Sequence, residues 1–108
     1  MKKQIILTAV GLVFATMTSY AGDIDAQGLW DKHCKKCHGD TGAADTKLGE
    51  KLEIGDYTKA ETLADVSDEE LFADTKNGVD GTKMPSFEKK LSDDEINALV
   101  AHIRAMAK

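Results

Sequence analysis

The residues most able to do chemistry are two cysteines and a histidine that lie close together. Cys34 and Cys37 are the only cysteines of the chain, and His38 follows directly. A zinc site normally needs a second Cys/His pair, and a thioredoxin-like redox pair expects a strand–helix–strand setting that is not indicated here. A structural disulfide would not require the histidine. Covalent attachment of haem by a C-x-x-C-H motif accounts for all three residues together.

The spacing of the motif has a physical basis. Cysteines three residues apart on a helical turn can reach the two vinyl groups on one side of a porphyrin, so that Cys34 and Cys37 would form two thioether bonds to one haem c. The next residue, His38, would then lie under the iron, where its imidazole is expected to be the proximal axial ligand.

The second axial ligand is predicted to be Met84. This methionine lies in a loop before the only proline, Pro85, which restricts Met84 to an extended backbone and stiffens the loop. Phe87 is expected to anchor the loop against the core. Three alternatives are less suitable. Met106 lies in a last helical turn that is expected to fray. His33 directly precedes the motif and is expected to point away from the iron, and His102 lies on a helix.

Residues 1–21 have the features of a cleaved signal peptide. A basic start with Lys2 and Lys3 precedes a ten-residue apolar segment, 5–14, which is about half the length that a transmembrane helix needs. Small residues three and one positions before the predicted cleavage point suit a signal peptidase. Cleavage after Ala21 would release a chain that begins at Gly22, so we expect a periplasmic protein without stable membrane insertion.

The charge of the exported chain limits its partners. Without Lys2 and Lys3, the 14 basic residues fall to 12 against 19 acidic residues, a net charge of −7 with histidines neutral. Such a chain would be repelled by nucleic acid and by anionic membranes. Its charge instead favours long-range attraction to redox partner proteins with basic surfaces.

Residues 22–108 are predicted to form a single all-α domain, because apolar residues recur at helical intervals and no window alternates as a strand would. Trp30 and Leu29 are assigned to the core of a first helix, and Leu99 and Ile103 to that of the last. The expected helical segments are 25–36, part of 46–51, 57–64, 67–77 and a last helix that begins after Ser92, with loops over 38–47 and 79–87.

Two of these helices carry clear start signals. Ser67–Glu70 and Ser92–Glu95 both have the Ser-x-x-Glu form of a capping box. Asn77-Gly78 is a typical left-handed stop for the first of the two helices. A domain of this size is near the limit at which its own core gives enough stability, and a large apolar cofactor would supply the remainder.

On these residues the chain resembles the class I cytochromes c. The similarity extends over the mature sequence, with the segments Ala26-x-x-x-Trp30-x-x-x-Cys34, Cys34-x-x-Cys37-His38-Gly39, Leu71-Phe72, Gly78, Met84-Pro85 and Leu91-Ser92-Asp93-Asp94-Glu95-Ile96. The resemblance implies three to five helices wrapped around one covalently bound haem, with the N- and C-terminal helices crossing. The chain departs from the family at Ala26, where a glycine is usual, and at His102, where an aromatic residue is usual.

The predicted haem site implies a function, and the resemblance adds a candidate role for Tyr57. A haem ligated on both faces has no open site for a substrate, so we expect a monomeric, soluble carrier of single electrons and not an enzyme. The Tyr57 hydroxyl would serve a haem propionate or simply pack. Three lysines belong either to a solvated surface or to a docking site at the haem edge: Lys35, Lys36 and Lys83. The alternatives are a subunit of a larger respiratory complex and a five-coordinate haem protein that binds gas or peroxide.

Overall fold

The computed structural model describes residues 24–108, and all regular structure within them is helical. These residues form five α-helices and one 3₁₀ helix in the order α2 (Ala26–His33), α3 (Lys35–His38), α4 (Lys47–Lys51), η2 (Ala60–Leu63), α5 (Asp68–Asn77) and α6 (Asp93–Arg104). The predicted all-α class is therefore confirmed for this part of the chain. The predicted signal peptide lies outside the described residues.

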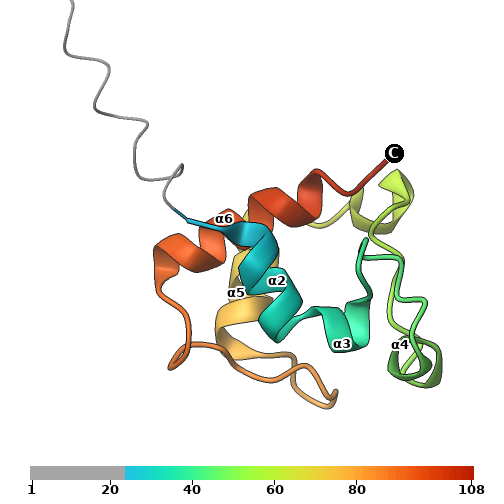
Figure 1. Ribbon diagram of the computed structural model, residues 1–108, viewed down its shortest axis with the longest axis horizontal. Helices are drawn as coiled ribbons and strands as arrows, with labels where there is room; N and C mark the ends of the chain where they lie inside the picture. The colour runs from blue at the N-terminus through green and yellow to red at the C-terminus, as the bar shows by residue number, and fades with distance from the viewer. Residues whose placement is uncertain (1–23) are drawn as a thin grey trace, which may run out of the picture.

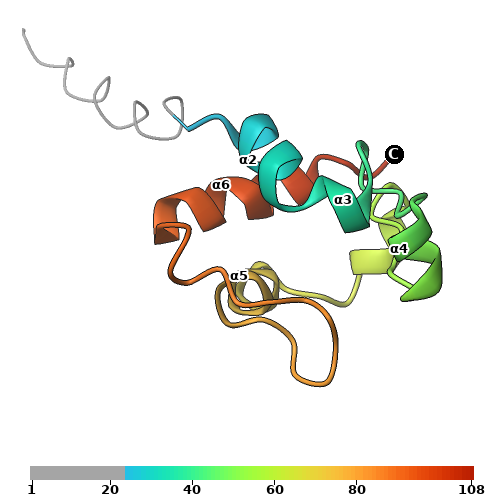
Figure 2. The same ribbon diagram turned by 60° about the horizontal axis from the view of Figure 1, so that its bottom comes forward.

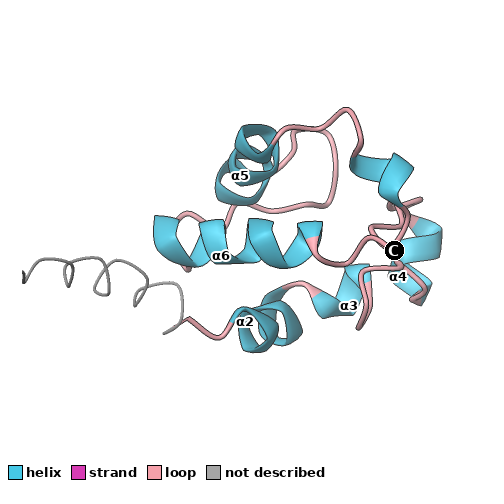
Figure 3. Cartoon of the chain, turned by 90° about the horizontal axis from the view of Figure 1, so that it is seen from above, coloured by secondary structure: helices cyan, strands magenta, loops and turns pink. Residues whose placement is uncertain are grey.

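Helix α6 is the centre of the arrangement. It lies between α2 and α5 (Figure 3) and packs against both, whereas α3 and α4 lie at the far end of the molecule (Figure 2). The predicted crossing of the first and last helices is seen where α2 meets α6 (Figure 1). The core consists of buried side chains from these helices and the segment before α6: Trp30, Leu71, Phe87, Leu91, Ile96, Leu99, Val100 and Ile103.

Both predicted helix starts are confirmed. At α6, the Ser92 N–H donates to Glu95 Oε1 at 2.8 Å and Ser92 Oγ accepts from the Glu95 N–H at 3.1 Å, which completes a capping box. At α5, Ser67 Oγ accepts from the Glu70 N–H at 3.0 Å. Helix α5 ends at Asn77, and the next residue, Gly78, has the positive φ, +79°, that was predicted for this stop.

Arg104, at the end of α6, ties that helix to the start of α5. Its Nε lies 2.7 Å from Asp68 Oδ1, and its Nη1 donates to the Leu63 carbonyl at 3.1 Å. Its Nη2 donates to the Val66 carbonyl. One side chain therefore fixes the segment that leads into α5.

The first predicted helix is not continuous. Residues 25–36 were expected to form one helix, but Cys34 has φ −119° and separates α2 from α3, which ends at His38. The indole Nε1 of Trp30 donates to the Gly39 carbonyl at 2.8 Å. An unbroken helix would place Gly39 about 13 Å further along the axis than Trp30, so this buried bond requires the break.

The C-terminal turn is also different from the prediction. Met106 was expected to fray, but it is half-buried and packs on the loop at Gly42, with its Cε 3.5 Å from where a Cβ on that glycine would lie. The Lys108 N–H donates to the Thr58 carbonyl at 2.9 Å. Because Gly42, at φ +86°, has no side chain, Met106 can pack against it, and this contact and the Lys108 bond both join the last turn to the rest of the domain.

Candidate haem-binding site

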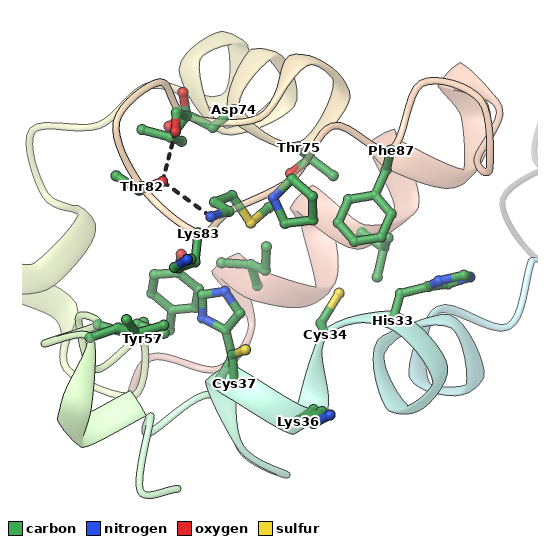
Figure 4. Close-up of a pocket in the computed structure, with 18 of the residues that line it drawn as sticks. His33, Cys34, Lys36, Cys37, Tyr57, Asp74, Thr75, Thr82, Lys83 and Phe87 are labelled. Carbon is green, nitrogen blue, oxygen red and sulfur yellow. Dashed lines mark hydrogen bonds between the residues drawn. The ribbon is translucent and has the colours of Figure 1, made fainter. Parts of the chain in front are cut away.

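A cavity of about 480 Å³ opens between α3 and the loop that follows α5 (Figure 4). Its volume lies within the range of about 300–1,000 Å³ that is usual for ligand pockets. All four residues that were predicted to hold a haem line this one cavity: Cys34, Cys37, His38 and Met84. The rest of the wall is largely apolar, with contributions from Leu52, Ile54, Leu71, Val79, Leu99 and Ile103.

The two cysteines lie on the α3 side of the cavity as free thiols (Figure 4). Burial, and then the nearby Cys37, raise the pKa of Cys34 to about 11. Dithiol redox chemistry needs a thiolate, so a thiol with this pKa is poorly suited to it at neutral pH. Within residues 24–108, no three His, Cys, Asp or Glu side chains are close enough together to hold a metal ion.

His38 ends α3 with its imidazole between two aromatic rings. It stacks on Tyr57, with ring centroids 5.1 Å apart and an interplanar angle of 18°, and lies 5.6 Å from the Trp30 ring. Its Nδ1 is buried without a hydrogen-bond partner among the described residues. Burial lowers the pKa of His38, which keeps the ring neutral, and the neutral form is the one that binds a metal.

The backbone that carries these ligands is anchored from the loop that follows it. Thr46 Oγ1 donates to the Cys37 carbonyl at 2.8 Å, and the Ala44 N–H donates to the His38 carbonyl at 2.7 Å. Thr46 also caps α4 by accepting from the Gly49 N–H at 2.8 Å. The end of α3 is thus held by bonds to two residues of the next segment.

Met84 lies in the loop across the cavity. The Met84 N–H donates to Thr82 Oγ1 at 3.1 Å, and this hydroxyl donates to the Val79 carbonyl at 2.7 Å (dashed lines, Figure 4). The Val79 N–H returns to the Met84 carbonyl at 3.2 Å. As predicted, Phe87 is buried at the end of the loop, where its N–H donates to the Thr75 carbonyl at 3.1 Å.

The three lysines left open by the sequence fall into two groups. Lys35 pairs with Asp40 at 3.0 Å on the surface. Lys36 and Lys83 are exposed and line the cavity. Only these two are therefore placed where a docking partner would meet the cavity.

The wall also includes residues that sequence reasoning did not place there, among them His33 and Asp74. His33 was expected to point away from the iron; it lines the cavity, and its ring lies edge-on to Phe87 with the ring centroids 5.5 Å apart. Burial, and then Lys32, lower the pKa of His33. Asp74 also lines the cavity, and its position three residues after the buried Leu71 was the helical signal that could have revealed it.

A protein family described as "Cytochrome C oxidase, cbb3-type, subunit III" matches residues 22–103. The chain belongs to the c-type cytochromes. The cofactor of this family is a covalently bound haem c, and its members transfer electrons to partner proteins and are typically exported from the cytoplasm. They are generally carriers rather than enzymes.

Solved structures agree with this assignment. The "KustC0563 c-type cytochrome" is 38% identical, with a TM-score of 0.72 over 79% of this chain and 100% of that one. A tyrosine-to-phenylalanine mutant of Kustc0563 is 36% identical, with a TM-score of 0.68 over 77% and 99%. The "c-type cytochrome NirC" is 26% identical, with a TM-score of 0.54 over 77% and 91%. No curated protein matches the sequence.

The residues of the cavity suit the family's cofactor. Two free thiols share one side with a neutral imidazole that has a buried, unpartnered nitrogen. The surrounding wall is apolar enough for a porphyrin. Within the described residues, no helix has both the length and the hydrophobicity to cross a membrane.

Proposed function

We propose that this cytochrome is an exported, soluble carrier of single electrons, whose haem is attached at Cys34 and Cys37 and ligated by His38 and Met84. The observation that carries the proposal is that these four side chains line one cavity, although 46 positions separate the two ligands. His33 lines the same cavity, but its ring packs edge-on to Phe87. Met106 is not part of the wall, because it packs beside Gly42.

Each residue would have a distinct task. The bound haem supplies an iron that changes oxidation state by one electron. Cys34 and Cys37 would hold the ring against α3, and His38 would be oriented by its stacking on Tyr57. Met84 would close the other face with a soft thioether, which favours the ferrous state. With both faces closed, the iron would offer no open position to a substrate, and the protein would act as a carrier.

Export to the periplasm is the second part of the proposal. The family match begins at residue 22, which is also where the mature chain is predicted to begin. Sequencing of the mature protein should therefore start at or next to Gly22. We expect a monomer whose net charge of −7 attracts partners with basic surfaces.

The family description favours a second candidate function. Because that description names an oxidase subunit, the same domain could serve inside a larger respiratory complex. Gel filtration and co-purification from the native host distinguish the two. A free carrier elutes as a small monomer, whereas a subunit elutes with its complex.

Replacement of Met84 tests the ligand assignment. Met84→Ala should remove the weak charge-transfer absorption that the family's methionine-ligated ferric haem shows, lower the reduction potential and allow binding of an added ligand. Met106→Ala is the matched control, because Met106 lies outside the cavity wall and should leave all three unchanged. If Met84→Ala keeps the wild-type spectrum and potential, the assignment is wrong. Rapid binding of carbon monoxide to the reduced wild type would instead favour the five-coordinate alternative.

A separate measurement tests the attachment. Haem should stay with the denatured wild-type protein during extraction with acidic acetone, because thioether bonds survive it. Cys34→Ala combined with Cys37→Ala should release the haem into the solvent. Extraction of haem from the wild type would contradict covalent attachment at these cysteines.

A further inference from the structure

Two acidic side chains line the cavity, the exposed Glu53 and the half-buried Asp74. Helix α5 contributes Leu71, Asp74 and Thr75 to the wall, and the first and last of these are buried. The Thr75 hydroxyl is satisfied within the helix, where it donates to the Leu71 carbonyl at 2.9 Å. Asp74 is half-buried, and Figure 4 shows it on the side of the cavity opposite Tyr57.

The charge of Asp74 is not neutralised by a neighbour. The ion pairs of the described chain join other residues, so Asp74 forms none of them. The other charged residues of the wall are exposed and also form no ion pair within residues 24–108: Lys36, Glu53 and Lys83. Asp74 is therefore a half-buried carboxylate on the cavity wall without an ion-pair partner among the described residues.

Asp74 and Tyr57 lie on opposite sides of the cavity. Tyr57 stacks on His38, the proposed proximal ligand. The carboxylate on α5 therefore borders the space that the haem would occupy, on the side away from Tyr57.

We propose that Asp74 lowers the reduction potential of this cytochrome and so restricts which donor proteins can reduce it. This inference rests on the haem site proposed above. Reduction transfers one electron from a donor protein to the ferric iron and removes one positive charge, with no bond formed or broken. A fixed carboxylate stabilises the more positive, oxidised form, which opposes the effect of the Met84 sulfur.

The size of the effect follows from Coulomb's law. For a partly buried charge at the wall of a cavity of this size, the equilibrium constant for reduction by a given donor should change by about tenfold. Salt should reduce this effect only in part, because charges inside a cavity are less screened than those on the surface.

Potentiometric titration of the haem-loaded variants tests the proposal. Asp74→Asn should raise the equilibrium constant for reduction by about tenfold relative to wild type. Asp74→Glu, which keeps the charge, should leave this constant within about twofold of the wild-type value. The control is Glu69→Gln, which removes an exposed charge from the same helix outside the cavity wall. In Glu69→Gln the equilibrium constant for reduction should change by less than about twofold, and this change should vanish in high salt.

Three results would overturn the inference. The first is a reduction potential of Asp74→Asn equal to that of Glu69→Gln. The second is a shift of the potential in Asp74→Glu as large as that in Asp74→Asn. The third is loss of the methionine absorption in both neutral variants, Asp74→Asn and Asp74→Ala, which would show a structural role. A failure of the proposed ligation is separate, because it would appear in the spectrum of the wild type before any variant is made.

Discussion

The two sides of the cavity are held in different ways. The α3 wall, residues 34–49, is held by buried and half-buried bonds, among them Trp30 Nε1 to the Gly39 carbonyl and Thr46 Oγ1 to the Cys37 carbonyl, both at 2.8 Å. The Met84 loop, residues 79–87, relies mainly on exposed bonds within itself and to the end of α5.

This difference suits the two kinds of bond that the proposal assigns to them. Two thioethers and an imidazole on one short helix need a fixed backbone, because all three must reach the same ring. A single thioether ligand from a loop can be released without loss of the cofactor. Segments with exposed hydrogen bonds open at a lower free energy than the core, so the Met84 loop should open before the α3 wall.

The largest effect is expected from Gly49→Ala, which breaks the α3 wall. A Cβ on Gly49 would overlap the Ala44 carbonyl, with the carbonyl carbon at 2.8 Å, and would lie 2.9 Å from the Cys37 oxygen. Overpacking against backbone should lower the free energy of unfolding by about 3 kcal/mol. Denaturant unfolding of the haem-loaded protein measures it. A loss below about 1 kcal/mol would mean that the wall is not rigid.

Trp30→Phe weakens the same wall more mildly. The indole is 1% exposed, and its removal leaves the buried Gly39 carbonyl without its donor. The free energy of unfolding should fall by about 2 to 3 kcal/mol, measured by thermal or denaturant unfolding. The methionine absorption should persist in the folded variant, because the Trp30 indole donates its hydrogen bond to Gly39 and not to the Met84 loop. Its disappearance would contradict the independence of the two sides.

Gly78→Ala tests the Met84 loop. With φ +79°, and with the Met84 oxygen 2.9 Å from the position of a Cβ, the substitution adds both strain and a clash. We expect the free energy of unfolding to fall by about 2 kcal/mol. An added ligand such as imidazole should bind the haem iron faster than in the wild type. Gly81→Ala is the control, because φ is +78° but nothing lies within 4 Å. Equal rates of ligand binding in both variants would show that the close approach has no effect on Met84.

The smallest effect is expected from Met106→Ala. This half-buried side chain packs on Gly42 and joins the last turn to the loop beside Tyr57. Its loss should lower the free energy of unfolding by about 1 kcal/mol, without a change in the haem spectrum. Met106→Leu, which keeps the volume, should restore most of the stability. No effect in either variant would support the fraying that was predicted from the sequence.

The elements that were predicted well are those specified by neighbouring residues. Ser92 and Glu95 satisfy one another across one helical turn, and Gly78 stops α5 by its own backbone freedom. The break at Cys34 was missed because the apolar periodicity over 25–36 does not show that the Trp30 side chain bonds the Gly39 carbonyl. The packing of Met106 was missed for the same reason, since its partner Gly42 lies far along the chain.

The sequence by itself determined the chemistry of this protein. Two cysteines, an adjacent histidine and a methionine before a proline indicated a covalent haem and two candidate ligands, because those side chains have few other uses in that pattern. Only the tertiary structure decided which residues share the cavity with them. The packing of α5 against α6 sets Asp74 across from Tyr57, and no spacing within either segment determines that pairing. Contacts between distant segments depend on how helices pack, and this is decided by the whole core.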